Sequence, residues 1–191
     1  LSGATMGTGW TLSFAAPDTI TNPIVVAALE ETFTRVVQQM SGWEPTSDLC
    51  RFNSADAGWR DLPEEFFKVL KRALEIAELT SGAYDPALGA KVDALGFGPT
   101  TAVIPEARCA VRDPYLNDGT RRAMGSGLPR SLSSGRPQAG PVDSSRDDSG
   151  WRHIKLDLEK CSAFQPGGVT LDLSSIAKGH AVDLCATRLR T

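Results

Sequence analysis

The sequence has no excess of basic charge and no long apolar run, and each shortage excludes a class of protein. Among 191 residues, 20 lysines and arginines stand against 23 aspartates and glutamates, which gives a formal net charge of −3. Without a basic surface, the chain is not suited to binding a nucleic-acid backbone. No apolar run approaches the roughly 20 residues that a membrane-spanning helix needs, so no transmembrane segment is expected.

Cysteine is also scarce, and the four cysteines are Cys50, Cys109, Cys161 and Cys185. No two of them form a Cys-x-x-Cys pair, so we do not expect a zinc centre. We expect Cys50 to be a buried thiol, and whether two of the others form a disulfide stays open. The chain starts at Leu1 without a signal peptide. We therefore expect a processed or excised piece of a longer protein, whose compartment cannot be read from it.

One long stretch almost lacks large apolar side chains. Residues 112–150 are rich in glycine, serine, proline and arginine. Such a segment buries too little apolar surface to offset the entropy of ordering it, so we predict that it is disordered or weakly ordered. The chain is long enough for one domain with a hydrophobic core, and we predict a single domain over residues 1–191 that contains this stretch.

Two segments have the apolar spacing of amphipathic helices. The first runs from Pro23 to Met40, and Asn22 is a suitable cap for it. The second begins with Asp61 as its expected cap and Pro63 in its first turn, and it ends near residues 80–82. The apolar faces are expected to carry Val26, Leu29, Phe33, Val36, Val37 and Met40 in the first helix and Phe66, Phe67, Leu70, Ala73, Leu74 and Ala77 in the second.

Three further segments favour strands. Residues 9–14 and 151–158 alternate between apolar and polar side chains, so each is predicted to be a half-buried strand, with Phe14 and Leu158 on the apolar faces. Residues 169–173 form a short apolar run that we interpret as a buried strand after a turn at residues 165–168. Strands and helices do not alternate regularly, so we predict an α+β fold with a mixed or antiparallel sheet and packed helices.

The residues from 169 to 182 carry the most chemistry. After the predicted strand the apolar spacing becomes helical, and Ser174 or Ser175 is a natural cap. The free amides of a helix N-terminus attract phosphate, and Lys178 adds a positive charge in the same turn. Asp172 suits the hydroxyls or ring nitrogens at the other end of such a ligand. On these residues alone, a capped and solvated helix start is an equally good interpretation.

Four segments form a pattern in fixed order. They are M-G-T at residues 6–8; M-S-G-W-E-P-T-S-D-L-C-R-F-N at 40–53; S-G-A-Y-D-P-A-L-G at 81–89, followed by G-F-G-P at 96–99; and L-D-L-S-S-I-A-K-G-H-A-V-D at 171–183. This order resembles that of the ApbE family, the FAD:protein FMN transferases. Residues 171–183 are similar to the family signature L-D-L-G-x-I-A-K-G-Y-A-V-D. The resemblance covers only the N-terminal part of a family chain. It implies an ApbE-like, T-fold-like domain that is incomplete at its C-terminal end.

The resemblance also implies roles for individual residues. Ser175 falls where the family uses a Mg2+ ligand, through an oxygen of the backbone or the side chain. Trp43 is implied to contact the flavin, and the alternative is a tryptophan that fills the core. His180 stands in place of the family's tyrosine and is expected to pack or hydrogen-bond rather than catalyse. Proline after Asp85 excludes the helical region for that residue and so fixes where its carboxylate points. The implied FAD contacts are Met6, Trp43, Ala83, Tyr84, Asp85, Asp172 and Lys178.

The implied activity is transfer of FMN from FAD, with Mg2+, to a threonine hydroxyl of a flavin-accepting electron-transfer protein. The metal would neutralise phosphate oxygens while the pocket aligns the reacting groups. The family's catalytic residues and remaining Mg2+ ligands are expected beyond Thr191, so we expect this chain to lack transferase activity of its own. A Mg2+-dependent FAD pyrophosphatase and a non-enzymatic flavin-binding or accessory module stay open as alternatives.

The family resemblance suggests a setting as well. Family members are typically exported, so we expect a periplasmic location and contact with a membrane only through a lipoprotein anchor that this sequence does not contain. The family crosses the region of residues 112–150 with a short connection, so this stretch would be either a long insertion or the product of a translated frameshift.

Overall fold

The computed structural model describes residues 1–15, 20–99 and 150–190. Its helices are α1 (Asn22–Met40), α2 (Asp48–Asn53), α3 (Glu64–Leu79), α4 (Gly89–Ala94) and α5 (Ser174–Arg188), with a 3-10 turn, η2 (Gly150–His153). Its strands are β1 (Ser2–Thr5), β2 (Thr8–Thr11), β3 (Gly58–Asp61), β4 (Lys155–Asp157) and β5 (Ser162–Gln165). The strands form two small antiparallel sheets, β1-β2 and β3-β5-β4. The α+β prediction is therefore confirmed.

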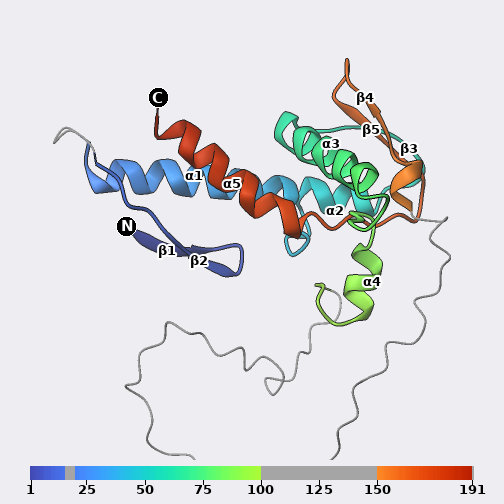
Figure 1. Ribbon diagram of the computed structural model, residues 1–191, viewed down its shortest axis with the longest axis horizontal. Coiled ribbons are helices and arrows are strands. Elements are labelled where there is room, and N and C mark those ends of the chain that lie inside the picture. Colours follow the sequence, from blue (N-terminus) through green and yellow to red (C-terminus); the bar gives the residue numbers. More distant parts are fainter. Residues whose placement is uncertain (16–19, 100–149, 191) are drawn as a thin grey trace, which may run out of the picture.

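The helices form the body of the structure. Helix α5 lies against α1, and α3 packs against both of them, as Figure 1 shows. The hairpin β1-β2 lies beside α1, whereas the three-stranded sheet stands at the other end of the molecule (Figure 1). None of the helices in the described ranges has the length and apolar content needed to cross a bilayer.

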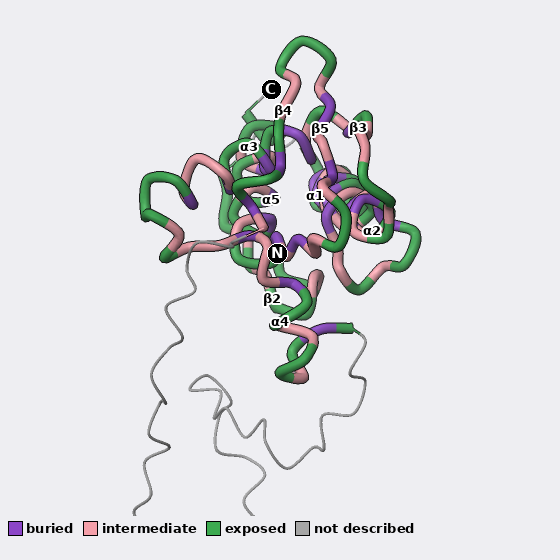
Figure 2. The backbone as a smooth tube through the Cα atoms, turned by 90° about the vertical axis from the view of Figure 1, so that its right-hand side faces the viewer, coloured by how far each residue is buried: buried purple, intermediate pink, exposed green. Residues whose placement is uncertain are grey.

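The hydrophobic core has a large part and a small part. The large cluster joins α1, α2, α3 and α5 to residues of the sheet, and its fully buried members include Phe66 and Leu70. The small cluster joins Val25 and Leu29 of α1 to Cys185 of α5, beneath the hairpin. Figure 2 shows this arrangement: buried residues gather in the interior, while most of α4 is exposed or intermediate.

The first predicted strand is shorter than expected, and its partner was missed. Strand β2 ends at Thr11, and the side chain of Phe14 is 41% exposed, so it does not join the apolar face. The preceding strand β1 pairs with β2 from Ser2 opposite Thr11 to Thr5 opposite Thr8. Leu12 still exchanges backbone hydrogen bonds with Leu1, at 2.8 and 2.9 Å, and the paired stretch ends there, short of Phe14.

The long helices match their predictions except at their starts. Helix α1 includes Asn22 and has Thr21 at its N-cap, and that cap makes no side-chain bond. Helix α3 begins at Glu64, and Asp61 is not its cap. Asp61 is the last residue of β3 and lies opposite Ser162 of β5. Asp61 therefore pairs within the sheet, although the local sequence predicted it as the N-cap of the helix.

The second predicted strand is mostly wrong. Trp151 is buried in the turn η2, and only Lys155–Asp157 form a strand. The side chain of Leu158 is 63% exposed, because the chain turns at Asp157, whose Oδ1 accepts hydrogen bonds from the two backbone amides that follow Leu158. Strand β5 was not predicted. The expectation of disorder for residues 112–150 falls, apart from Gly150, outside the described residues.

The described cysteines do not form disulfides. Cys50, Cys161 and Cys185 are free thiols, and Cys109 lies outside the described residues. Burial raises the pKa of the Cys185 thiol, although the Thr32 hydroxyl and the charge of Arg188 act in the opposite direction. Cys185 is therefore an inert thiol that belongs to the core.

Candidate functional site

A cleft of about 780 Å³ opens where five parts of the chain meet. They are the hairpin tip, the end of α1 with the loop after it, α2, α4 with residues 97–99, and residues 170–178. This volume lies within the range of small-molecule sites, about 300–1,000 Å³. Its walls are mostly apolar, and its charged lining residues in the described ranges are Asp93, Asp172 and Lys178.

Four of the sequence-predicted site residues line this cleft: Met6, Trp43, Asp172 and Lys178. Met6 stands at the tip of the hairpin and is half-buried against the large core cluster. Trp43 follows α1, and its side chain is 63% exposed, so it does not fill the core. An exposed indole at the wall of a cleft offers a flat apolar surface to a planar ring.

The other four predicted residues do not line the cleft. Tyr84 and Ser175 face each other, and the Ser175 hydroxyl donates to the Tyr84 hydroxyl at 3.4 Å. The Asp85 carboxylate folds back on its own turn and accepts a hydrogen bond from the backbone N–H of Ala87 at 2.8 Å. Ala83 is exposed. In this structure Tyr84 contacts the first turn of α5 through Ser175, and the predicted flavin contacts of Ala83, Tyr84 and Asp85 stay predictions.

The start of α5 differs from the prediction. The N-cap position is Leu173, and neither Ser174 nor Ser175 caps the helix with its hydroxyl. Instead, Asp172 Oδ1 accepts a hydrogen bond from the backbone N–H of Ser174 at 2.8 Å. The protein's own carboxylate thus offsets part of the positive end of the helix dipole, and the exposed ammonium of Lys178 is the cation beside the cleft.

The segment before α5 is extended but is not the predicted strand. In the described ranges its only ladder contact is a single parallel bridge between Leu88 and Thr170. The backbone N–H of Gly89 donates to Thr170 O at 2.9 Å, and the backbone N–H of Asp172 donates to Pro86 O at 2.8 Å. A Cβ on Gly89 would lie 2.8 Å from Thr170 O. Glycine at position 89 therefore permits the close approach of the two backbones.

On its other side the segment is held by side chains of α2 and β5. The side-chain amide of Asn53 makes two hydrogen bonds to the backbone of Leu171. Gln165 is fully buried, and its Nε2 donates to the carbonyls of Phe52 and Val169 at 2.9 and 3.0 Å. Leu171 lies far from Asn53 along the chain, and only folding brings the two residues together.

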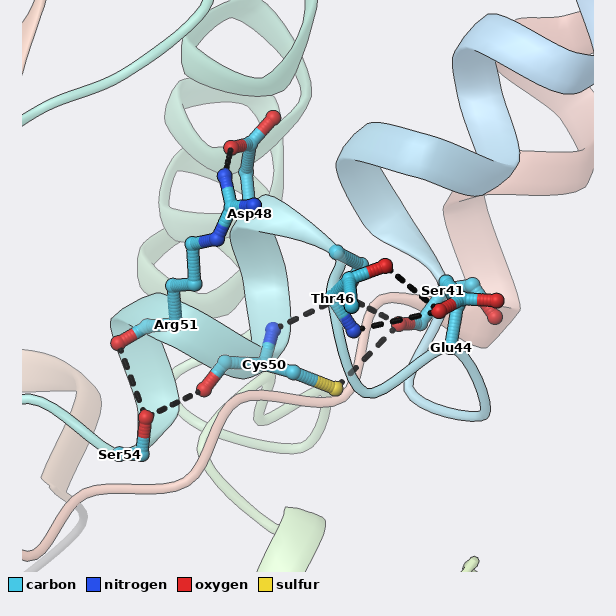
Figure 3. A network of polar contacts seen from close by, with 8 residues as sticks. Ser41, Glu44, Thr46, Asp48, Cys50, Arg51 and Ser54 are labelled. Carbon is cyan, nitrogen blue, oxygen red and sulfur yellow. Dashed lines mark hydrogen bonds and ion pairs between the residues drawn. The ribbon is translucent and has the colours of Figure 1, made fainter.

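The loop between α1 and α2 is fixed by its own polar groups, as Figure 3 shows. Ser47 caps α2 as predicted and accepts from the Cys50 backbone N–H at 3.0 Å. The Thr46 hydroxyl and then its backbone N–H lower the pKa of the Glu44 carboxyl by hydrogen bonding. Cys50 was expected to be buried, but it is half-buried and lines the cleft, with Sγ 3.5 Å from Gly42 O. A small side chain there keeps the cleft open behind Trp43.

Helix α5 is also tied to α3. His180 Nε2 lies 2.8 Å from Glu65 Oε2, and both side chains are largely buried. The expectation that His180 hydrogen-bonds is confirmed. The other histidine, His153, is exposed. Neither His180 nor Glu65 lines the cleft, so the effect of the pair is to fix α5 against α3.

Helix α4 and the turn after it were missed as parts of the site. Val92 and Asp93 of α4 and Phe97 line the cleft opposite the start of α5. The G-F-G-P motif was interpreted only as a turn, and Gly96 indeed has φ of 84°. The sequence did contain a signal for this part of the site: Phe97 stands between two glycines. A large apolar side chain in a tight turn has no nearby core to fill.

The described residues do not by themselves build a Mg2+ site. No group of three histidine, cysteine, aspartate or glutamate side chains in the described ranges is placed to hold a metal ion. Ser175, the predicted ligand, offers one exposed hydroxyl that already contacts Tyr84. Mg2+ requires near-octahedral oxygen coordination, which this one group does not supply.

Comparisons with known proteins agree with the motifs. The model of the ApbE family matches residues 6–191. The FAD:protein FMN transferase of Vibrio cholerae is 29% identical over 195 residues, which covers 100% of this chain and 48% of the relative. The FAD:protein FMN transferase of Klebsiella pneumoniae is 32% identical over 187 residues, which covers 96% and 45%. This chain thus spans about half the length of the curated relatives it matches.

Solved structures show the same fold. The flavin transferase ApbE from Vibrio cholerae superimposes with a TM-score of 0.68 at 24% identity, over 100% of this chain and 52% of that one. The apo form of Pseudomonas stutzeri flavinyl transferase ApbE gives a TM-score of 0.66 at 22% identity, over 100% and 54%. With the motifs, the cleft and the family match over residues 6–191 all in agreement, the chain belongs to the ApbE family.

Proposed function

We propose that this chain binds FAD in the cleft and provides the FAD-holding part of an FAD:protein FMN transferase. The observation that carries the proposal is the convergence of Met6, Trp43, Asp172 and Lys178, from three separate parts of the sequence, on one cleft of ligand size. The names of the relatives support it, because the matched proteins of Vibrio cholerae and Klebsiella pneumoniae are FAD:protein FMN transferases.

The chemistry of the lining suits the parts of FAD. Met6 and Trp43 offer a polarisable thioether and an indole face to an aromatic ring system. Asp172 uses one oxygen to hold Ser174, which leaves the other to accept a hydrogen bond from a ligand hydroxyl or ring N–H. Lys178 is placed to pair with a phosphate as a compact point charge.

Mg2+ dependence enters this proposal through the charge of the cleft. Asp93 and Asp172 line it against the single ammonium of Lys178, and the pyrophosphate of FAD adds further negative charge. Mg2+ commonly binds through one or two carboxylates together with substrate phosphates and water. We therefore expect FAD to bind more tightly when Mg2+ accompanies it, with the phosphates supplying oxygens that the described residues lack.

The reaction we propose for the family site is transfer of FMN to a threonine hydroxyl of a flavin-accepting electron-transfer protein. For residues 1–191 alone we propose FAD binding without transfer. The described ranges hold no group of acidic, histidine or cysteine side chains suited to a metal, and phosphoryl transfer depends on such charge stabilisation.

The test is a titration of FAD into the purified chain, followed by flavin fluorescence, with Mg2+ or with a chelator. Saturable quenching that strengthens with Mg2+ is expected. Lys178→Ala should weaken binding about tenfold, as for the loss of a charge-assisted contact. Lys155→Ala is the matched control, because Lys155 is an exposed lysine of β4 that does not line the cleft. No saturable binding, or equal losses in the two variants, would overturn the assignment of the cleft.

A second assay separates the activities. The chain is incubated with FAD, Mg2+ and a threonine-bearing acceptor domain, and the products are examined by in-gel flavin fluorescence and by nucleotide chromatography. Unchanged FAD and an unlabelled acceptor are expected. A fluorescent acceptor would show that residues 1–191 transfer FMN by themselves, and free FMN with AMP would show a pyrophosphatase instead.

A further inference from the structure

The segment from Val169 to Asp172 carries a cleft carboxylate but belongs to no sheet. In the described ranges its ladder pairing is limited to the one bridge between Thr170 and Leu88. The backbone N–H and C=O groups of an extended segment without neighbouring strands need other hydrogen-bond partners, because such groups are nearly always paired when they are buried. The position of this segment therefore depends on the other groups that bond to it.

The side chain of Asn53 makes two of those bonds to a single residue. Its Nδ2 donates to Leu171 O at 2.9 Å, and its Oδ1 accepts from the Leu171 backbone N–H at 2.8 Å. One donor and one acceptor on the same partner residue reproduce a hydrogen-bonded pair of an antiparallel ladder. The carboxamide thus acts as a one-residue strand neighbour across 118 positions of sequence.

Asn53 itself lines the cleft, and it is held firmly. It is the last residue of α2, whose start is capped by Ser47. The adjacent Phe52 is buried in the large core cluster, and its carbonyl accepts a hydrogen bond from the fully buried Gln165. The amide of Asn53 therefore comes from a fixed element and can set the position of Leu171, rather than follow it.

The bonded residue stands directly before the cleft carboxylate. Leu171 and Leu173 are both buried in the core, at 2% and 0% exposure, whereas Asp172 between them is half-buried; Leu171 and Asp172 both line the cleft. This is the alternation of an extended chain, in which successive side chains take opposite faces. A shift of Leu171 would move Asp172 and, through its bond to the Ser174 N–H, the first turn of α5.

We propose that Asn53 is a positioning residue for flavin binding, which acts by holding Leu171 so that Asp172 and the start of α5 face the cleft. This rests on the proposed function, since it concerns the same cleft. The role requires a donor and an acceptor side by side, which explains why a carboxamide stands at the end of α2, a position that local sequence would fill with any polar residue.

The first test compares Asn53→Ala with Gln39→Ala. Gln39 Oε1 accepts a hydrogen bond from the Phe66 backbone N–H at 3.1 Å, so the control also removes a side-chain bond between two elements, but away from the cleft lining. Amide exchange of Leu171, followed by NMR without ligand, should become about tenfold faster in N53A, and FAD affinity should fall about tenfold, as for the loss of buried hydrogen bonds. Q39A should stay within about twofold of wild type in both measurements.

The second test uses Asn53→Asp and pH. When protonated, the N53D carboxyl both donates and accepts, so it can restore both bonds to Leu171. When ionised, it only accepts, and it places negative charge against the Leu171 carbonyl. An aspartic acid titrates near pH 4 in its ordinary range. We expect FAD affinity relative to wild type at the same pH to be within about twofold at pH 4, where about half of the carboxyl is protonated, and about tenfold lower at pH 8, a pH dependence that the loss in N53A should not show.

The outcomes separate the two proposals. Equal effects of N53A and Q39A on Leu171 exchange and on FAD affinity would overturn the positioning role, and so would an N53D loss that is the same at both pH values. If the wild-type chain shows no saturable FAD binding, the proposed function fails. The exchange rate of Leu171 in N53A then still decides whether Asn53 holds the segment.

Discussion

The turn that presents Met6 to the cleft is a sensitive test of the site. Met6 and Gly7 join β1 to β2 as a two-residue loop, with φ of 50° and 70°. Such loops need positive φ at both positions and normally contain Asn-Gly, Asp-Gly or Gly-Gly. An ordinary L-residue in this region loses about 1–2 kcal/mol. Methionine at this position therefore makes the turn less stable, so we expect its side chain to have a role outside the turn.

Two variants separate the backbone strain from the side chain. Met6→Ala keeps the strain and loses the half-buried side chain, which should lower the free energy of unfolding by about 1 kcal/mol, half the value for full burial. Met6→Asn loses the same apolar contacts but tolerates positive φ, so the relief of about 1 kcal/mol should leave stability near that of wild type. Both variants lose the thioether, and FAD affinity should fall about two- to tenfold in each.

The assays are thermal unfolding and FAD titration on all three proteins. For a chain of this size, 1 kcal/mol corresponds to about 2–4 °C in Tm, so M6A should melt by that amount below M6N. Equal Tm values for the two variants would show that the positive φ of Met6 stores no strain. Wild-type FAD affinity in M6N would show that the thioether does not contact the flavin.

Three further predictions follow from the contacts of the site and the core. Gly89→Ala places a Cβ 2.8 Å from Thr170 O, so we expect a loss of about 1–3 kcal/mol in denaturant unfolding, and wild-type stability would contradict the close approach. Asp172→Asn keeps an acceptor for the Ser174 N–H, so it should unfold like wild type while Asp172→Ala loses about 1 kcal/mol, and both should lose the Mg2+ enhancement of FAD binding. The pKa of Cys185 is raised by burial, so its contribution to stability is present below the thiol's unfolded value, about 8.5, and is lost as pH rises through the folded value. Between pH 8 and pH 10 the Tm of Cys185→Ala should therefore fall less than that of wild type, and equal falls would refute this assignment.

Periodicity was a good guide wherever one element buries a whole face. Helices α1 and α3 lie within a few residues of their predicted ranges, because a stripe of large apolar residues such as Phe66 and Leu70 has one favourable orientation towards a core. The short strands were harder. Strands β1, β3 and β5 carry little pattern of their own, and each exists because a partner strand pairs with it.

The candidate site divides in the same way. Motifs in the sequence pointed to Met6, Trp43, Asp172 and Lys178, and the structure places all four at one cleft. The same motifs grouped Ala83, Tyr84, Asp85 and Ser175 with them, although these four lie beside the cleft lining. Adjacency in a motif fixes which residues are near one another along the chain, but not which side of the backbone each side chain takes.

The sequence by itself determined the family, the α+β class, the long helices and the residues that we propose to bind FAD. Only the tertiary structure decided how the segment before α5 is held, because among the described residues it pairs through a single bridge and is bonded by the carboxamide of Asn53 and the backbone of Pro86 and Gly89. The tertiary structure likewise decided that Asp172, and not a serine, bonds the first amide of α5. Both follow from the same physical fact: a buried polar group bonds to whatever the fold brings within reach, and sequence distance does not limit that choice.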